Sequence, residues 1–307
     1  MNKEIFSDLL AKSSIKNIGG DLPSSNPDSA DGNKSMVWYF NDKVGQKWVI
    51  KQYPEWINEA DISWIHNYMG ELTQRQFPIA GFEGIPLQFD RRFYAIYSYA
   101  HGHRYNSENQ AHLIDMSLKL GELHSLSKNI KINGSRNWPV VANFKYQGNN
   151  KFLTHVWQVA AGLLENNTNT LMPIHGDFRK DNIRFNDNGI SKIFDFGNAR
   201  NDYPEVDLAI TLRDISQGLQ LSDLLNIQSE FLQIYSNLGT RLPRIYPNLI
   251  FASAVILGIQ ESTYLLGDYS KNKNKKTKTS IDNEIKNLNF LLQNFTEYTS
   301  LYKSIFS

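Results

Sequence analysis

The sequence predicts an α+β protein with two lobes, a small strand-rich N-terminal lobe and a larger, mostly helical C-terminal lobe. The chain has 307 residues, more than the roughly 100 to 200 residues of a typical domain. Runs of aromatic and β-branched residues lie mainly within residues 1–100, and helical spacing of apolar residues dominates over residues 101–307. We therefore expect the boundary between the lobes near residue 100.

The composition excludes several classes of function. With 32 Lys+Arg against 31 Asp+Glu, the net charge is +1, so we expect neither nucleic acid nor an anionic membrane as a partner. The absence of cysteine excludes disulfides, thiolate metal sites and a cysteine nucleophile. Charged residues interrupt the opening segment where a signal peptide is apolar. The apolar run 250–259 is about half the length of a membrane span. We therefore expect a cytoplasmic protein in which this run forms a buried helix.

The N-terminal lobe contains helix, loop and strand patterns in that order. The opening residues predict a short amphipathic helix, and the Gly-, Ser-, Asn- and Asp-rich segment 17–34 predicts a loop. Two runs, 35–40 and 47–53, predict a β-hairpin because they are rich in aromatic and β-branched residues. Helical spacing predicts a helix over 56–72, and the run 93–99 predicts a further strand.

The C-terminal lobe is dominated by helical patterns. Ser107 is the predicted N-cap of a helix that continues to about residue 125. Further helices are predicted at 151–166, 221–237, 245–266 and 281–296. The lysine-rich run 271–278 predicts a solvated or disordered loop because its charges have no helical periodicity. A β-like stretch, 171–200, separates these helices and contains most of the polar residues with a chemical role.

Two motifs within this stretch indicate phosphoryl transfer. The first is H-G-D-x-x-x-x-N, from His175 to Asn182, and the second is D-F-G, which starts at Asp195. A magnesium-bound nucleotide needs hard oxygen ligands such as a carboxylate and an amide, and the attacking hydroxyl needs a carboxylate to accept its proton. We therefore expect Asp177 to accept the proton and Asn182 and Asp195 to hold Mg²⁺.

These motifs, followed by Y-P-E-V-D-L-A at 203–209, resemble those of the aminoglycoside phosphotransferase and choline-kinase-like family. The segment 174–214 is similar in particular to the homoserine kinase II branch. The resemblance implies a protein-kinase-like fold, with residues 1–100 as the nucleotide-binding lobe and residues 101–307 as the catalytic and substrate-binding lobe. It also implies that the protein phosphorylates a hydroxyl of a small molecule, with ATP and Mg²⁺.

The resemblance implies further site residues in the N-terminal lobe. Lys51 ends the run W-V-I-K, which is similar to the V-A-I-K of kinases, and is expected to bind the α and β phosphates. Its implied partner is Glu59 on the following helix, with Glu55 as the alternative. The implied adenine contacts are backbone groups of Ser98, Tyr99 and Ala100.

The phosphate-covering loop departs from the family pattern. Gly19, Gly20 and Gly32 do not form G-x-G-x-x-G. The sequence therefore does not assign the backbone amides that cover the phosphates. It also differs here from the opening expected of a homoserine kinase.

Three residues near the motifs have structural alternatives. Arg179 can neutralise charge on the γ-phosphate or be a surface arginine. Asp207 is expected to brace the catalytic loop, because its apolar neighbours predict burial and a buried carboxylate needs partners. His175 is expected to pack and orient the loop rather than act as a base.

The favoured acceptor is an antibiotic or a related metabolite rich in amino and hydroxyl groups. A cationic acceptor needs carboxylates, for which the candidates are Asp202, Glu205, Glu230, Glu261 and Asp268. The alternative is a metabolic kinase of homoserine, choline or a sugar-like alcohol. A protein kinase is disfavoured because no A-P-E follows D-F-G. A non-catalytic kinase-like binding protein is disfavoured because the chain keeps Lys51, Asp177, Asn182 and Asp195 together.

Overall fold

The chain divides into two compact units. The computed structural model describes residues 3–13, 15, 24–25, 35–134, 136, 141, 144–165 and 170–306. Unit 1 comprises Met1–Tyr105, Ile130–Arg136 and Asp181–Gly197, and unit 2 comprises Asn106–Asn129, Asn137–Lys180 and Asn198–Ser307. The predicted loop 17–34 lies, except for residues 24–25, outside the described residues.

Unit 1 is built on an antiparallel sheet with the strand order β1-β2-β3-β5-β4. Its strands are β1 (Ser24–Ser25), β2 (Met36–Asn41), β3 (Lys47–Gln52), β4 (Phe82–Phe89) and β5 (Arg92–Ser98). The predicted strands at 35–40, 47–53 and 93–99 are confirmed as β2, β3 and β5. β4 was not predicted.

The β2–β3 hairpin is closed by an aspartate. The Asp42 Oδ1 atom accepts hydrogen bonds from the backbone N–H groups of Val44, at 3.0 Å, and Gln46, at 2.8 Å. Gly45 supplies the positive φ of 83° that the turn requires. The resulting register pairs Val37 with Lys51, so the sheet fixes the position of the lysine backbone.

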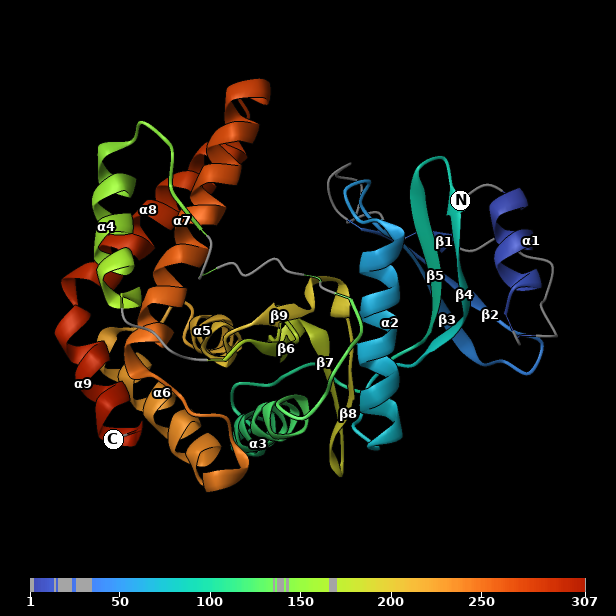
Figure 1. The fold of residues 1–307 in the computed structure, drawn as a ribbon, viewed down its shortest axis with the longest axis horizontal. Helices are drawn as coiled ribbons and strands as arrows, with labels where there is room; N and C mark the ends of the chain where they lie inside the picture. The colour runs from blue at the N-terminus through green and yellow to red at the C-terminus, as the bar shows by residue number, and fades with distance from the viewer. Residues whose placement is uncertain are drawn as a thin grey trace. The chain divides into compact units, whose positions relative to one another are not determined.

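Helix α1 (Lys3–Ala11) packs against β4 and β5 of this sheet (Figure 1). Its buried side chains, Ile5, Phe6 and Leu9, lie 5%, 7% and 1% exposed in one hydrophobic cluster. The other buried members of this cluster come from the sheet and are Trp38, Phe40, Ile50, Leu87, Tyr94 and Ile96. The predicted opening helix is therefore confirmed as part of the unit 1 core.

Helix α2 (Glu59–Gln74) begins three residues later than predicted. Asn58 is its N-cap and accepts a hydrogen bond from the Asp61 backbone N–H, while the Asp61 carboxylate accepts one from the Asn58 backbone N–H. This reciprocal capping box satisfies two of the free donors at the helix start. The helix therefore starts after Asn58 and not at residue 56.

The hairpin of β7 (Ile183–Asn186) and β8 (Gly189–Ile193) belongs to unit 1. Ile193 donates its backbone N–H to the Pro78 carbonyl at 2.7 Å and accepts from the Ala80 N–H at 2.9 Å. An isolated bridge also joins His103 to Phe185. These bonds fix both ends of the hairpin, and with them the segments that contain Asn182 and Asp195.

Unit 2 is mostly helical. Its helices are α3 (Gln110–Ser127), α4 (Lys151–Leu164), α5 (Pro204–Ile215), α6 (Leu221–Ser236), α7 (Pro247–Asn272), α8 (Lys275–Gln293) and α9 (Phe295–Phe306). A two-stranded sheet pairs β6 (Met172–Ile174) with β9 (Arg200–Asp202). The predicted helices are confirmed with shifted ends, and the pattern at 281–296 divides between α8 and α9. The α+β prediction of a strand-rich N-terminal and a helical C-terminal part is confirmed.

Two local predictions in unit 2 were wrong. Asn109, not Ser107, caps α3, because its side chain accepts from the Ala111 N–H at 3.1 Å. The expected loop 271–278 is a short connection between two helices: Lys273 adopts the left-handed conformation and Asn274 caps α8. The remaining lysines of this run lie on helical turns, where exposed charged side chains are tolerated.

The long apolar helix α7 occupies the middle of unit 2. It contacts α4, α5, α8 and α9 (Figure 1). By length and composition it could cross a membrane, and 61% of its most apolar window is buried inside the described structure. The expected buried run 250–259 lies in this helix, and Ile250, Val255 and Ile259 are fully buried.

Candidate active site

Unit 1 contains a cavity of about 170 Å³ lined by strands of the sheet and by the end of the β7–β8 hairpin. Val37, Val49 and Ala80 supply apolar walls, and Lys51 and Asp195 supply opposite charges. Small-molecule sites typically combine apolar walls with a few polar groups. The cavity therefore brings together Lys51, Asp195 and all three of the expected adenine-contact residues.

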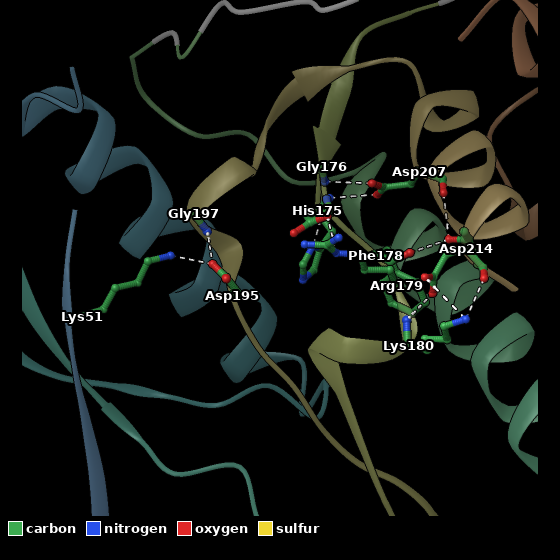
Figure 2. Close-up of polar contacts among 12 residues, drawn as sticks. Lys51, His175, Gly176, Phe178, Arg179, Lys180, Asp195, Gly197, Asp207 and Asp214 are labelled. Atoms are coloured by element: carbon green, nitrogen blue, oxygen red, sulfur yellow. Dashed lines mark hydrogen bonds and ion pairs between the residues drawn. The ribbon is translucent and has the colours of Figure 1, made fainter. Parts of the chain in front are cut away.

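Lys51 points into this cavity from the end of β3. Its Nζ atom lies 2.5 Å from Asp195 Oδ1, and the residue is 8% exposed (Figure 2). The same ammonium lies 4.9 Å from the centre of the Tyr53 ring, a favourable position for a cation. Lys51 is therefore held as a buried positive charge with a fixed direction.

Asp195 adopts an unusual backbone conformation. Its φ is +66°, a left-handed value that is uncommon outside glycine and clusters at functional sites. Its Oδ1 atom accepts from the Gly197 N–H at 3.4 Å, and its side chain is 41% exposed. The preceding residue, Phe194, donates its N–H to the Asn182 carbonyl at 3.0 Å. This bond joins the segments that contain the two expected metal ligands.

The donor set of Asn182 and Asp195 fits Mg²⁺. A carboxylate and an amide oxygen are hard ligands, and magnesium is usually held by only one or two carboxylates together with substrate phosphates and water. Both residues belong to unit 1, and Asn182 is 6% exposed while the Asp195 carboxylate reaches the surface. No cluster of three or more His, Cys, Asp and Glu side chains suited to a metal occurs among the described residues.

The structure corrects the expected partner of Lys51. Glu59 is the first residue of α2 and is exposed, so its side chain is at the solvent end of the helix. Glu55, the alternative, pairs with Arg92 at 2.9 Å. Asp195 makes the ion pair with Lys51 instead. The expected Lys51–Glu59 pair fails because the capping box delays the helix start and leaves Glu59 in its first turn.

The expected adenine contacts lie where β5 ends. Ser98 donates its N–H to the Gly81 carbonyl at 2.9 Å, and Tyr99 donates to the Lys47 carbonyl at 3.2 Å. The Ala100 N–H donates to no other backbone group within the described chain, although the residue is only 9% exposed. Because a buried donor needs a partner, Ala100 is the best placed of the three to donate to a ligand.

A buried hydroxyl network behind Lys51 was not predicted. The Tyr53 and Tyr97 hydroxyl groups share a short hydrogen bond, and the Tyr97 hydroxyl also lies 2.9 Å from His66 Nε2. Burial lowers the pKa of His66 to about 4 and raises the pKa of Tyr97 well above its ordinary value. Histidine and tyrosines at these separations along the chain carry no local signal, so only the fold reveals the network.

Arg184 is a second cavity residue that sequence reasoning missed. It lies in β7, two positions after Asn182, and its guanidinium carbon is 4.8 Å from the centre of the Phe194 ring. Its Nη1 atom donates to the Asp181 and Ile183 carbonyls at 3.0 and 2.8 Å. Burial, and then the charge of Arg104, lower the pKa of Arg184. The cavity therefore contains a second fixed cation.

The H-G-D loop of unit 2 is held by Asp207 of α5. The Asp207 carboxylate accepts from the His175 N–H at 2.9 Å and the Gly176 N–H at 2.7 Å (Figure 2). It also accepts from His124 Nε2 at 3.3 Å. Burial by itself would raise the pKa of Asp207, but the bonds from His124 and the charges of His124 and His175 outweigh it, and the pKa is lowered. The geometry fits the brace expected for Asp207.

Two further residues on the same face of α5 also bind the backbone of the H-G-D loop. Thr211 and Asp214 follow Asp207 at helical spacings of four and seven, which place all three on one side of the helix. Thr211 Oγ1 donates to the Phe178 carbonyl at 2.7 Å, and Asp214 accepts from the Lys180 N–H at 2.8 Å. The spacing of these polar residues after the motif is a signal that could have identified them.

Asp177 and Arg179 form an ion pair in this loop. Arg179 Nε lies 2.9 Å from Asp177 Oδ1. The Arg179 side chain is 48% exposed and the Asp177 side chain is 16% exposed. The Asp177 backbone N–H donates to His175 Nδ1 at 3.2 Å, and His175 is fully buried. These contacts agree with an orienting role for His175.

Two of the five candidate carboxylates for a cationic acceptor are engaged inside unit 2. Asp202 and Glu205 are fully buried; Asp202 accepts from Arg200 Nε at 3.0 Å, and Glu205 accepts from the Tyr246 N–H at 2.7 Å. Glu230 accepts from Gln110, and Asp268 from Asn272. Asp202 and Glu205 therefore stabilise the fold, which removes them from the set that an acceptor could meet.

Comparison with known proteins identifies the family. The family model described as "Phosphotransferase enzyme family" matches residues 29–239, which is more than half of the chain. The chain belongs to the phosphotransferase enzyme family. As a member, it is an enzyme that transfers phosphate to a small molecule, and the kinase-like resemblance of the H-G-D and D-F-G motifs is confirmed at family level.

Solved structures of phosphotransferases share the fold. An amicoumacin kinase in complex with AMP-PNP superposes with a TM-score of 0.71 at 12% identity, over 94% of this chain and 93% of the other. A microcompartment-associated aminopropanol kinase gives 0.71 at 12% identity, over 98% and 99%. A putative aminoglycoside phosphotransferase from Ralstonia eutropha gives 0.63 at 13% identity, over 97% and 98%. No curated protein matches the sequence significantly. The predicted protein-kinase-like fold is confirmed.

Proposed function

We propose that this phosphotransferase transfers the γ-phosphoryl group of ATP, with Mg²⁺, to a hydroxyl of an antibiotic or a related metabolite rich in amino and hydroxyl groups. The observation that carries the proposal is the Lys51–Asp195 ion pair inside the apolar cavity of unit 1. A nucleotide triphosphate needs both a cation and a metal ligand, and this pair supplies one of each. Structures of the fold with AMP-PNP support ATP as the donor.

In this proposal residues 1–100 form the nucleotide-binding lobe. Lys51 donates to the α and β phosphates, where its positive charge offsets theirs. The Ala100 N–H, together with the backbone of Ser98 and Tyr99, binds the edge of adenine. The apolar side chains of β2 and β3 cover the base. Glu59 takes no direct part, since it is exposed at the start of α2.

Residues 101–307 form the catalytic and substrate-binding lobe. Asp177 accepts the proton of the attacking hydroxyl, which is the contribution of a general base. The Arg179 guanidinium beside it orients the carboxylate in the free enzyme and neutralises charge that develops on the transferred phosphoryl group. Asp207 keeps the loop backbone fixed, so the position of Asp177 does not depend on solvent-exposed contacts alone.

Asn182 and Asp195 would hold Mg²⁺. When bound, the metal supplies positive charge that offsets the charge of the phosphates. The left-handed backbone at Asp195 and the bond from the Phe194 N–H to the Asn182 backbone carbonyl support a site whose backbone is ordered before any nucleotide arrives. Such preorganisation lowers the cost of ordering the site on binding.

The names of similar structures support an acceptor with an amino group next to hydroxyl groups. Those structures include an aminopropanol kinase, a putative aminoglycoside phosphotransferase and a spectinomycin phosphotransferase with ADP and its antibiotic. The aminopropanol kinase also favours a second candidate function, a metabolic kinase of a small amino alcohol, with choline, homoserine or a sugar-like alcohol in the same class. The similarity to homoserine kinase II stays a prediction. We expect a cytoplasmic enzyme that uses neither nucleic acid nor a membrane.

The test is a transfer screen with γ-labelled ATP. The acceptor panel contains antibiotics with amino and hydroxyl groups, aminopropanol, choline, homoserine and sugars, each with and without Mg²⁺. We expect label in an antibiotic-type acceptor, and only with Mg²⁺. Label in a small amino alcohol instead would support the second candidate function, a metabolic kinase. Absence of any rise in melting temperature with millimolar MgATP would contradict the nucleotide part, because a bound ligand must stabilise the folded state.

A further inference from the structure

The D-F-G segment of unit 1 is tied to α2 through an arginine rather than through Lys51. Arg136 Nη1 donates to the Gly197 carbonyl at 3.0 Å, and Arg136 Nε lies 3.5 Å from Asp61 Oδ1. Asp61 is in the first turn of α2, and Gly197 is the last residue of D-F-G. One guanidinium therefore contacts both the helix and the motif.

The surroundings of Arg136 favour a fixed bridge. The arginine is 4% exposed, and the Asp61 side chain is 22% exposed. A buried guanidinium is costly unless it is paired and hydrogen-bonded. Here Nη1 makes the hydrogen bond to Gly197, and Nε makes an ion pair with Asp61 rather than a hydrogen bond. Asp61 is itself held by the capping box with Asn58. Its carboxylate therefore presents a defined position to Arg136.

Two further contacts show what the bridge would position. The Tyr68 ring of α2 packs edge-on against Phe196, with ring centres 5.9 Å apart. The Gly197 N–H donates to Asp195 Oδ1, and a Cβ added at Gly197 would lie 2.5 Å from Lys51 Nζ. Gly197 thus donates to Asp195 and lies close to the Lys51 ammonium, so a shift of this residue would disturb the separation of the two charged groups.

We propose that Arg136 is a positioning residue: paired with Asp61, it fixes Gly197 and thereby holds Asp195 in place against Lys51. In this chain the Arg136–Asp61 pair connects α2 to the nucleotide site, which is the connection that a Lys51–Glu59 pair was expected to make. The inference rests on the proposed function for its effect on catalysis. Its structural content, a D-F-G segment held by Arg136, is independent of the acceptor.

The test combines amide hydrogen exchange of the nucleotide-free protein with nucleotide kinetics. The variants are Arg136→Gln and Asp61→Asn, because asparagine keeps an acceptor for the Asn58 N–H but removes the charge. The matched controls are Arg75→Gln and Glu71→Gln, which break an exposed ion pair on the same helix. Exposed pairs of that kind contribute little to stability.

We expect both bridge variants to exchange the amides of residues 195–197 about tenfold faster, since local opening then requires breaking fewer bonds. The KM for ATP and the Mg²⁺ concentration for half-maximal nucleotide binding should each rise about tenfold, in keeping with the loss of one charge-assisted bond. The double variant Asp61→Asn/Arg136→Gln should be no worse than Arg136→Gln alone, because residues that act as a unit are not additive. The controls should match the wild type in all three measurements.

Exchange at residues 195–197 in Arg136→Gln that equals that of Arg75→Gln overturns the proposal. Additive losses in the double variant also overturn it. If Arg136→Gln does not fold, Asp61→Asn decides by the same exchange measurement. Because exchange is read without nucleotide, this failure is distinct from a wild-type protein that transfers no phosphate, which would overturn the proposed function instead.

Discussion

Replacing Asp207 with asparagine tests how the catalytic loop is held. The Asp207 carboxylate is fully buried, and its two oxygens accept three hydrogen bonds, from the Gly176 and His175 N–H groups and from His124 Nε2. The change keeps the size of the side chain but replaces one oxygen by an NH₂ group. In either orientation of the amide, a donor then faces a backbone N–H of the loop.

The magnitude follows from these bonds. The less costly orientation sacrifices the bond from Gly176 and leaves two donors facing each other, while the other two bonds lose their ionised acceptor. A bond to a charged group contributes about 1.5 to 3 kcal/mol, and a buried unsatisfied donor costs about 1 to 3 kcal/mol. We therefore expect Asp207→Asn to lower the free energy of unfolding of unit 2 by about 3 to 5 kcal/mol.

The assay is urea unfolding followed by circular dichroism, with Asp187→Asn as the control. Asp187 is exposed in the β7–β8 turn, where a change of charge should alter stability by less than about 0.5 kcal/mol. A loss below about 1 kcal/mol in Asp207→Asn would refute the view that this carboxylate braces the loop. An increase in stability would do so as well.

Two further predictions follow from buried groups. The pKa of His66 is depressed to about 4, so the unfolded chain binds a proton at a higher pH than the folded protein. The free energy of unfolding should therefore fall by up to about 3 kcal/mol as pH drops from about 6.5 to 4. Urea unfolding at pH 7 and 5 should show a smaller fall in His66→Gln than in the wild type, and an equal fall in both proteins would contradict the prediction. Gly176 has a φ of 75°, and a Cβ there would lie 2.1 Å from the Asn198 carbonyl oxygen. Gly176→Ala should therefore cost at least about 2 kcal/mol and reduce transfer, whereas Gly162→Ala, with open space in α4, should be neutral or stabilising by calorimetry.

Local patterns were sufficient to predict much of the fold. The strands β2, β3 and β5 have a dense aromatic and β-branched composition, and the helices of unit 2 have clear apolar spacing. β4 was missed because Gly84 and Pro86 interrupt it, and its register shifts between Glu83 and Leu87; both residue types weaken a strand pattern. The run 271–278 was misassigned because two residues, Lys273 and Asn274, were enough to end one helix and cap the next.

The residues of the candidate site were likewise predictable only in part. Asp177, Asn182 and Asp195 could be identified because their motifs are contiguous and each residue type has a chemical role. Contacts between distant segments could not be identified: Arg136 lies 61 residues from its partner Gly197, and the ion-pair partner of Lys51 lies 144 residues away. Glu59 is exposed in the first turn of α2, whereas Lys51 is buried and pairs with Asp195. Such contacts depend on the tertiary fold, so a single sequence leaves them open.

The catalytic role of Asp177 can be measured by transfer of label from γ-labelled ATP to the best acceptor of the screen, by the wild type and by Asp177→Asn. We expect Mg²⁺-dependent transfer by the wild type and a loss of about a hundred- to ten-thousand-fold in Asp177→Asn, the usual contribution of a general base. The affinity for MgATP should be unchanged in the variant, because the cavity with Lys51 and Asp195 lies in unit 1. Transfer by Asp177→Asn at the wild-type rate would show that Asp177 is not the general base.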